Sequence, residues 1–249
     1  MTKAYLPLIA YALILGSPSA APAQRPAPPD EQSVRPGVND KYLDPQLNVD
    51  EWVQRFELES REVYRARHAI VEALGLKPGE RVADVGAGTG LFTPLLASKV
   101  GPQGWVYAVD IAPKFVERIQ QVALESKLAN VTPVLGDERR PRLPPECVDC
   151  VLICDVYHHF EYPLTTMTAV RAALKPGGRL VVADFERIPG VSSEWTLGHV
   201  RAGKEVFRKE IQAAGFRLVA EREIEGLEEN YCLEFTKPMP REASRVGSN

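Results

Sequence analysis

The sequence predicts an α/β fold in which a mostly parallel β-sheet lies between two layers of helices, a three-layer α/β/α sandwich. The first observation behind this prediction is an alternation along the chain of short, apolar, strand-like runs with longer segments whose apolar residues fall at helical spacing. Such alternation indicates a parallel sheet covered on both faces. The second is a glycine-rich turn at residues 86–90, directly after the first strand-like run, where such sheets hold small ligands.

The expected elements follow one another in a regular order. Residues 49–74 have helical character, and Gly75 and the pair Pro78 and Gly79 end that segment. Strands are expected at Arg81–Val85, Trp105–Val109, Val131–Leu135, Cys150–Cys154 and Arg179–Ala183, and helices between them near Leu91–Val100, Pro113–Ser126 and Leu164–Leu174. A further helix near Lys204–Ala214 precedes strands near Arg217–Ile224 and Tyr231–Thr236, whose short connection favours an antiparallel pair.

Residues 1–23 have the pattern of a secretory signal peptide. Lys3 precedes an apolar run over residues 4–15, and the small-residue sequence Ala21-Pro22-Ala23 stands before Gln24. The run is shorter than the ~20 apolar residues that a transmembrane helix needs. We therefore expect export to the periplasm or the medium after cleavage, and the alternatives are an uncleaved membrane anchor or an apolar tail without function.

The rest of the chain divides into three parts. Residues 24–48 are rich in proline and poor in large apolar side chains, which predicts an extended linker. Residues 49–237 form a single domain of ordinary size. Residues 238–249 lack periodicity and are expected to be a disordered tail.

The charge of the chain is nearly balanced. There are 30 basic and 33 acidic side chains, giving a net charge of −3. A nucleic-acid partner usually requires a concentrated basic face, and the local cluster Arg139, Arg140 and Arg142 lies among prolines in an expected loop. The sequence therefore predicts no nucleic-acid partner.

The glycine turn is suited to hold a ligand. Glycine adopts positive φ and has no Cβ, so a ligand can lie directly on the main chain. We expect the amides after the strand to be free, and the N-terminus of the helix from about Leu91 to favour a carboxylate or a phosphate.

The spacing of the turn separates two classes of ligand. Dinucleotide-binding turns follow the pattern G-x-G-x-x-G, which would require a glycine where this chain has Leu91. The turn instead has the pattern D-x-G-x-G-x-G, with Asp84, Gly86, Gly88 and Gly90. An acid at Asp84 would repel a pyrophosphate and attract an ammonium group.

These residues resemble the class I S-adenosylmethionine-dependent methyltransferases, whose cofactor carries both an ammonium and a sulfonium group. The resemblance covers nearly all of residues 50–237. It implies a Rossmann-like sheet of seven mostly parallel strands with a final antiparallel strand. The segment Asp155 to His159 and the segment Leu174 to Leu180 look like later motifs of the family.

Further cofactor residues are expected just after the strands. Asp110 follows the second strand, where an acid can accept hydrogen bonds from ribose hydroxyls. The resemblance implies that Asp137, after the third strand, lies by the adenine amino group. The full set expected to bind S-adenosylmethionine is Asp84, Gly86, Ala87, Gly88, Gly90, Asp110, Ile111, Asp137 and Asp155.

Tyr157, His158 and His159 are the candidate catalytic residues, because they follow the fourth strand where the methyl group should emerge. One histidine can act as a general base if the acceptor loses a proton. The alternative is that the histidine pair supports the loop. His199 and Arg201 either face the same pocket or begin the next helix and pair with its charges.

Two other features have both a functional and a structural interpretation. The helix with Trp52, Arg55 and Phe56 either covers the cofactor or belongs to the core. Cys150 and Cys154 lie in one expected buried strand, too extended to converge on a metal, and are interpreted as core residues. We therefore expect no metal site.

The expected function is transfer of a methyl group from S-adenosylmethionine to a small-molecule acceptor, and the resemblance is closest to quinone-biosynthesis methyltransferases. One alternative is an exported S-adenosylmethionine-binding module without turnover, suggested by the signal sequence. The other is a nucleotide-dependent oxidoreductase, which Leu91 and Asp84 disfavour. The acceptor, the atom that is methylated and the oligomeric state do not follow from the sequence.

Overall fold

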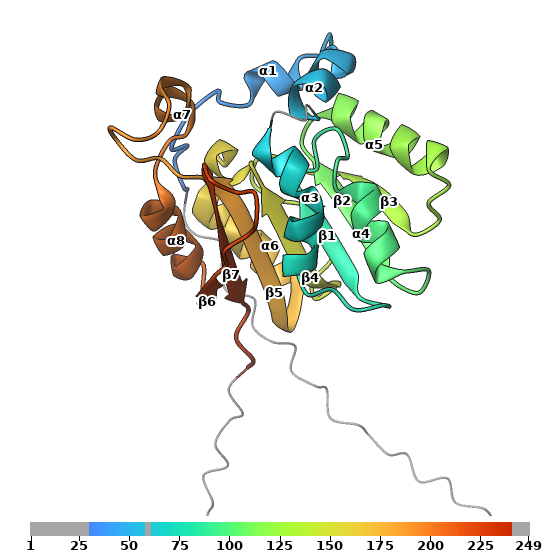
Figure 1. Ribbon diagram of the computed structural model, residues 1–249. Helices are drawn as coiled ribbons and strands as arrows, with labels where there is room; N and C mark the ends of the chain where they lie inside the picture. The colour runs from blue at the N-terminus through green and yellow to red at the C-terminus, as the bar shows by residue number, and fades with distance from the viewer. Residues whose placement is uncertain (1–29, 58–60, 241–249) are drawn as a thin grey trace, which may run out of the picture.

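The structure, a computed structural model, describes residues 30–57 and 61–240. Its centre is a seven-stranded sheet in the order β3-β2-β1-β4-β5-β7-β6 (Figure 1). The strands are β1 (Arg81–Val85), β2 (Trp105–Asp110), β3 (Val131–Leu135), β4 (Val148–Cys154), β5 (Leu174–Phe185), β6 (Arg217–Glu221) and β7 (Asn230–Thr236). The expected signal peptide, residues 1–23, lies outside the described residues, as do residues 241–249 of the expected tail.

The pairing of the strands confirms the predicted topology. Strands β1 to β5 pair in parallel, whereas β7 lies antiparallel to both β5 and β6. Strands β1 and β4 are almost entirely buried, and so is β5 from Leu180 to Phe185, as expected for a sheet covered on both faces. The order reverses at β1, because β2 lies on one side of it and β4 on the other. Ligands bind in such sheets at the carboxyl ends of the strands beside this reversal.

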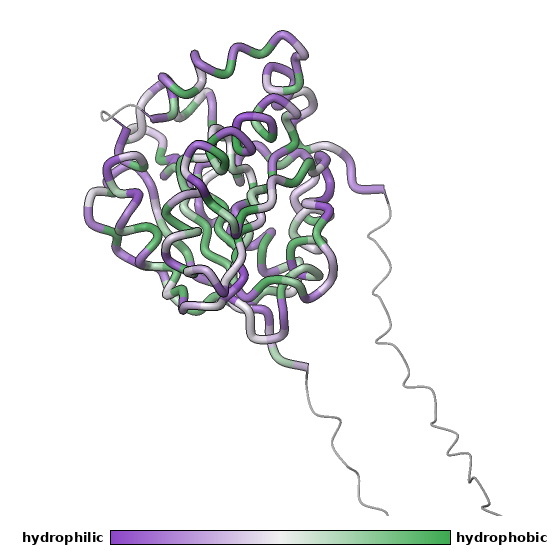
Figure 2. Tube along the Cα trace, turned by 90° about the vertical axis from the view of Figure 1, so that its right-hand side faces the viewer, coloured by the Kyte–Doolittle hydropathy of each residue, from purple (hydrophilic) through white to green (hydrophobic). Residues whose placement is uncertain are grey.

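Helices cover the two faces of the sheet. Helices α3 (Glu62–Ala73) and α4 (Thr93–Val100) pack on one face with Val82, Leu152 and Val181. Helices α6 (Pro163–Ala173) and α8 (Lys204–Ala213) pack on the other with Ile153, Val182 and Phe235. Helix α5 (Pro113–Glu125) contacts β2 and β3. The hydrophobic segments gather inside this arrangement (Figure 2), which confirms the three-layer α/β/α fold.

Short helices lie over one end of the sheet (Figure 1). They are α1 (Asp40–Leu43), α2 (Val49–Phe56), α7 (Glu194–His199) and the 3-10 turn η1 (Tyr157–His159). The helical character expected over residues 49–74 is therefore divided between α2 and α3. None of the helices in the described ranges has the length and apolar character needed to cross a membrane.

The expected linker differs from the structure in its described part, residues 30–48, which pack against the domain. The Glu31 carboxylate accepts hydrogen bonds from the amides of Leu164 (2.9 Å) and Thr165 (2.7 Å) at the start of α6. The Ser33 hydroxyl donates to Glu161 at 2.6 Å. A carboxylate at a helix N-terminus satisfies amides that have no partner within the helix. Composition alone did not reveal these polar contacts, which hold the segment in place.

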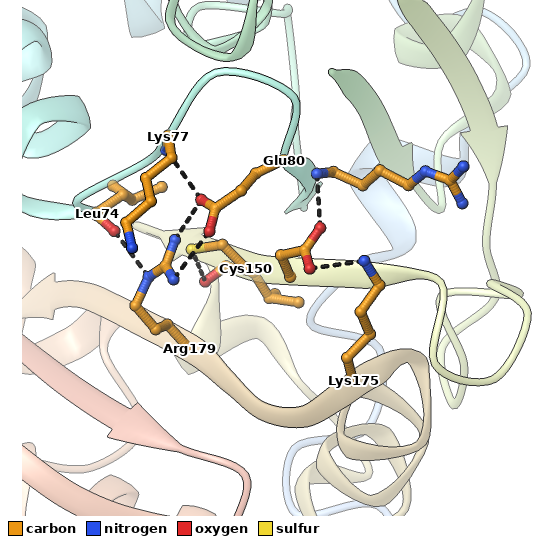
Figure 3. A network of polar contacts seen from close by, with 9 residues as sticks. Leu74, Lys77, Glu80, Cys150, Lys175 and Arg179 are labelled. Carbon is orange, nitrogen blue, oxygen red and sulfur yellow. Dashed lines mark hydrogen bonds and ion pairs between the residues drawn. The ribbon is translucent and has the colours of Figure 1, made fainter. Parts of the chain in front are cut away.

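The amino ends of the strands carry a network of polar contacts (Figure 3). The Arg179 guanidinium donates to both Glu80 oxygens, at 3.2 and 2.6 Å, and to the Leu74 carbonyl at 3.1 Å. Close by, Lys175 forms an ion pair of 2.6 Å with Asp149. Each of these charged groups therefore has a partner of opposite charge, at the end of the sheet away from the glycine turn.

Candidate active site

A cavity of about 540 Å³ opens at the carboxyl ends of the parallel strands. The glycine turn after β1 and Asp110 at the end of β2 line one part of it, and the histidines after β4 line another. Aromatic residues of α1, α2 and α5 also reach the cavity. The site therefore lies where the topology of the sheet predicts it.

The glycine turn provides an open surface. Gly86, Gly88 and Gly90 have φ values of 82°, 54° and 90°. Residues that carry a Cβ rarely adopt such values. A Cβ on Gly86 would lie 2.3 Å from the Val156 side chain. Glycine is therefore required there both by conformation and by space.

The expectation of free amides in the turn is wrong. The amides of Gly86 and Ala87 donate to the Val109 carbonyl at 2.8 and 3.0 Å. The Gly88 amide donates to the Asp110 carboxylate at 2.8 Å, and the Gly90 amide donates to Ala87 at 2.9 Å. Three of these amides thus donate to β2 and one donates within the turn, and α4 begins only at Thr93. The turn therefore provides a ligand with space, and these four amides are not available as hydrogen-bond donors.

Asp84 and Asp110 lie buried beside the turn. Asp84 is 2% exposed, and its Oδ2 atom has no hydrogen-bond partner among the described residues. Burial raises the pKa of Asp84 to about 7, and the charge of Asp110 adds to this rise. Burial also raises the pKa of Asp110 to about 6, although the amides of Ala112 and Gly88 partly stabilise its charged form. Two carboxyl groups that resist ionisation together form a site that favours a cation.

The remaining residues of the expected cofactor set also line the cavity. Ala87 and Ile111 lie there with Asp137 and Asp155. Arg142 Nε donates a hydrogen bond of 3.0 Å to the Asp137 carboxylate. Asp155 forms an ion pair of 2.7 Å with Arg61. Of the expected set, Gly90 alone is not among the residues that line the cavity, because its Cα faces Ile119 and Thr93. The structure brings the others to one site, and their individual roles remain predictions.

His158 is held by a buried carboxylate. Its Nδ1 atom lies 2.7 Å from Asp184 Oδ1, and the two side chains are 1% and 0% exposed. Its Nε2 atom is buried and has no hydrogen-bond partner within residues 30–57 and 61–240. The carboxylate therefore fixes the ring and leaves Nε2 available.

His159 and His199 lie against His158. The ring centroids of His158 and His159 are 4.3 Å apart, and the His199 ring is 5.0 Å from His158 and 5.1 Å from His159. Burial lowers the pKa of His159 to about 2 and that of His199 to about 4, so both rings are neutral near pH 7. Trp195 stacks on His199 with a centroid distance of 4.5 Å.

His199 and Arg201 were expected either to face the pocket or to pair with the next helix, and the structure shows one of each. His199 lines the cavity, whereas Arg201 forms an ion pair of 2.6 Å with Glu210 on α8. The helix that His199 ends, α7, was not expected.

The expected catalytic role of Tyr157 does not agree with the structure. Tyr157 is 0% exposed and packs against Phe160 and Phe207, and it is not among the residues that line the cavity. Consecutive residues of a tight 3-10 turn point in different directions, so His158 and His159 reach the cavity while Tyr157 enters the core.

An aromatic cluster closes the cavity on the side of α2. Trp52 lies 4.9 Å from Tyr42 and 5.1 Å from Phe56, measured between ring centroids, and Phe115 of α5 completes the group. All four line the cavity, as does Arg55. Of the two interpretations of this helix, these contacts support the one in which α2 covers the cavity. Tyr42 was missed because it lies in the segment expected to be a linker.

The cysteines are buried and free in the described chain. Cys154 lines the cavity, and Cys150 lies in the core at 0% exposure. This agrees with the interpretation of these side chains as core residues.

A family model described as a methyltransferase domain matches residues 76–235. The chain belongs to this methyltransferase family. The match spans β1 to β7 and contains the glycine turn and the histidines. It confirms the resemblance to class I methyltransferases and identifies S-adenosylmethionine as the cofactor.

Relatives of the methyltransferase agree with this assignment. The chain is 34% identical over 121 residues to the ubiquinone/menaquinone biosynthesis C-methyltransferase UbiE of Ectopseudomonas mendocina, covering 48% of the chain and 47% of that protein. It is 35% identical over 121 residues to a ubiquinone biosynthesis O-methyltransferase of Xanthomonas campestris, covering 49% of each. The match thus spans about half the length of these relatives.

A solved structure has the same fold. A SAM-dependent methyltransferase from Aquifex aeolicus matches with a TM-score of 0.62 and 25% identity, covering 76% of this chain and 98% of that one.

The residues of the cavity fit S-adenosylmethionine. The unpartnered Asp84 oxygen suits the ammonium group of the cofactor, and Asp110 can accept from ribose hydroxyls with its remaining lone pairs. The glycine turn leaves room where a Cβ would stand. The buried acids beside the turn also give a physical reason why a dinucleotide, with its negative pyrophosphate, does not suit this site.

Proposed function

We propose that the methyltransferase moves a methyl group from S-adenosylmethionine to a small-molecule acceptor bound in the same cavity. The observation that carries this proposal is the continuity of the cavity, which joins the acids and glycines of the cofactor side to the histidines after β4. Its volume of about 540 Å³ lies within the range of small-molecule sites, roughly 300–1,000 Å³.

The walls of the cavity favour a planar, partly apolar acceptor. Trp52, Phe56 and Phe115 provide apolar surface, and Trp195 lies at the wall formed by α7. The relatives named above act in quinone biosynthesis, which makes a phenol or a hydroquinone a suitable class to test first.

Alignment and exclusion of water are the main tasks of the protein in this reaction. When bound, S-adenosylmethionine supplies an electrophilic methyl group. The aromatic cluster of Tyr42, Trp52, Phe56 and Phe115 lines the side of the cavity where α2 lies and leaves water few polar partners there. An acceptor hydroxyl must also lose its proton, and His158, His159 and His199 are the side chains at the wall where such a group would lie. The role of His158 or His159 as general base remains a prediction.

We also propose export, supported by the signal-like pattern of residues 1–23. N-terminal sequencing of the mature chain tests it. A start at Gln24 is the expected result, a retained apolar segment would indicate a membrane anchor, and an intact N-terminus in the cytosol would refute export.

Calorimetry tests the cofactor. We expect S-adenosylmethionine to bind and a reduced nicotinamide cofactor not to bind. Asp110→Asn should weaken S-adenosylmethionine binding by at least about 10-fold, because an amide accepts fewer hydrogen bonds. Asp149→Asn, at the opposite end of the sheet, is the matched control and should not change the affinity. Absence of heat with S-adenosylmethionine would refute the proposal.

An acceptor screen with methyl-labelled cofactor tests turnover. Phenols, hydroquinones, amines and thiols are incubated with the full chain, and labelled products are identified by mass spectrometry. A methylated small molecule is the expected result. Cofactor binding without any methylated product would favour the binding module instead.

A further inference from the structure

Three of the four histidines of the chain gather at one wall of the cavity. His158, His159 and His199 each offer a ring nitrogen, and these nitrogens all lie within 4.8 Å of one another. His158 and His159 come from the turn after β4, and His199 comes from the end of α7, 40 residues later. The fourth histidine, His68, is exposed on α3. The cluster is thus assembled by the tertiary fold.

Two ring nitrogens of this cluster are buried without a partner. His158 Nε2 and His159 Nδ1 form no hydrogen bond with any residue that the structure describes. Buried polar atoms in folded proteins nearly always have a partner, so two unpartnered nitrogens at one place offer a ligand two binding atoms. A core of satisfied histidines would instead use these nitrogens in hydrogen bonds.

The surroundings of the cluster also match those of a metal ligand. Asp184, itself 0% exposed, contacts His158 Nδ1 at 2.7 Å and accepts from the His158 amide at 3.2 Å. Metal-binding histidines are commonly oriented in this way, with one nitrogen held by a carboxylate and the other directed at the metal. Arg35 holds the end of α7 by donating to the carbonyls of Gly198 and His199.

We propose that His158, His159 and His199 bind one divalent transition-metal ion, with Zn²⁺ the best-suited ion by ligand type. In a tetrahedral site with Zn–N distances of about 2.0–2.1 Å the nitrogens are about 3.4 Å apart. The present nitrogens lie within 4.8 Å of one another, so binding of the ion would require the two half-buried rings, His159 and His199, to turn towards it.

Three protein ligands leave a fourth position open to the cavity, which is the arrangement of catalytic rather than structural zinc sites. Resting on the proposed function, the metal would receive the oxygen or sulfur atom of the acceptor. Coordination lowers the pKa of such a group, and its proton passes to solvent. The oxygen or sulfur lone pair then forms the new bond to the methyl carbon, while the carbon–sulfur bond of the cofactor breaks and its electron pair returns to sulfur.

A Co²⁺ titration of the full, untagged chain after treatment with a chelator tests the site. Co²⁺ bound by three histidines absorbs visible light, and we expect one Co²⁺ per chain, displaced by one equivalent of Zn²⁺. His199→Ala should weaken Co²⁺ binding by at least about 10-fold, and His68→Ala is the matched control that should not change it. Absence of the absorption band, or equal binding by His199→Ala, would overturn the proposal.

A second variant separates a positioning effect from loss of the fold. Asp184→Asn keeps the size of the side chain and should weaken Co²⁺ binding by about 10-fold or more. Circular dichroism verifies that each variant is folded, and His159→Gln replaces any variant that is not.

Failure of the proposed metal site can be distinguished from failure of the proposed methyl transfer. S-adenosylmethionine binding is measured by calorimetry with the chelator present. Cofactor binding without Co²⁺ binding refutes the metal site alone. Co²⁺ binding without methylated product refutes the proposed function and leaves the site.

Discussion

The two ends of the sheet carry similar residue types in different states. At the amino ends of the strands, Glu80 and Arg179 satisfy one another and Asp149 is paired with Lys175 (Figure 3). At the carboxyl ends, Asp84 Oδ2 and His158 Nε2 are buried and unpartnered among the described residues. Burial of a polar group costs free energy unless a partner offsets it. The carboxyl ends of the strands therefore have polar atoms free to bind a ligand, whereas the paired charges at the amino ends stabilise the fold.

This difference between the two ends of the sheet leads to a general expectation. Substitutions at the carboxyl end should change ligand binding, and their effects on stability can have either sign. Substitutions at the amino end should reduce stability and leave binding unchanged. Four variants test this separation.

Gly86→Ala should have the largest effect. The new Cβ would lie 2.3 Å from Val156 at a φ of 82°, so the turn must shift. We expect S-adenosylmethionine affinity to fall by more than about 100-fold in calorimetry, and the free energy of unfolding to fall by about 2–4 kcal/mol. Gly79→Ala is the matched control, because Gly79 has a φ of 87° and open space around it. Equal effects of the two variants would mean that strain alone, without the Val156 contact, explains the loss.

Asp84→Asn should separate binding from stability. The cofactor ammonium loses its charged partner, and we expect affinity to fall by about 10- to 100-fold. Without ligand, the variant should be more stable than the natural protein by about 2–4 kcal/mol at pH 8, because burial raises the pKa of Asp84 from 3.8 to about 7.

The pH dependence gives the sign of this effect. The folded state holds the Asp84 proton to higher pH than the unfolded state does, so its burial penalty is absent near pH 3 and grows as the pH rises towards 7. Urea unfolding of both proteins between pH 4 and 8 measures the difference, which should increase with pH. A difference that stays constant would show that Asp84 does not titrate as described.

Arg179→Ala should act on stability alone. It removes two hydrogen bonds to Glu80 and one to the Leu74 carbonyl. We expect urea unfolding to show a loss of about 1–3 kcal/mol, since hydrogen bonds to charged groups contribute roughly that much. Cofactor affinity should stay within twofold of the natural protein, and a larger loss of affinity would break the separation between the two ends.

Lys175→Ala should have the smallest effect. Its ion pair with Asp149 joins side chains that are 41% and 24% exposed, and such pairs contribute about 0–1 kcal/mol. We expect the difference in unfolding free energy to vanish at 1 M NaCl, where charges are screened over about 3 Å. A loss above about 2 kcal/mol, or one insensitive to salt, would contradict this interpretation.

The sequence was informative where function depends on local geometry. The glycine turn, Asp84 and Asp110 follow directly from the end of a strand, and the alternation of strands and helices predicts where these ends meet. The hydrogen bonds of the turn amides were not predictable, because their acceptors, Val109 and Asp110, lie on the neighbouring strand.

The rest of the site depends on contacts between distant residues. His199 joins the cavity only because α7 folds back over the sheet, and Tyr42 lies in a segment whose proline-rich start indicates a linker. The direction of Tyr157 differs from that of His158 because of the 3-10 turn, whose geometry the sequence does not specify. The expectation of no metal site rests on the cysteines alone, because the sequence does not show that His199 lies beside His158 and His159.

Residues 30–48 can make their contacts only after distant parts of the chain have been synthesised. Glu31 meets α6 at Leu164, 133 positions later in the chain, and Arg35 meets His199, 164 positions later. At elongation rates of about 5–20 residues per second, this early segment waits roughly 7–33 s for its partners to be made. Residues 30–48, which contribute Asn39, Lys41 and Tyr42 to the cavity wall, therefore reach their final contacts only after strands β1 to β5 have been made.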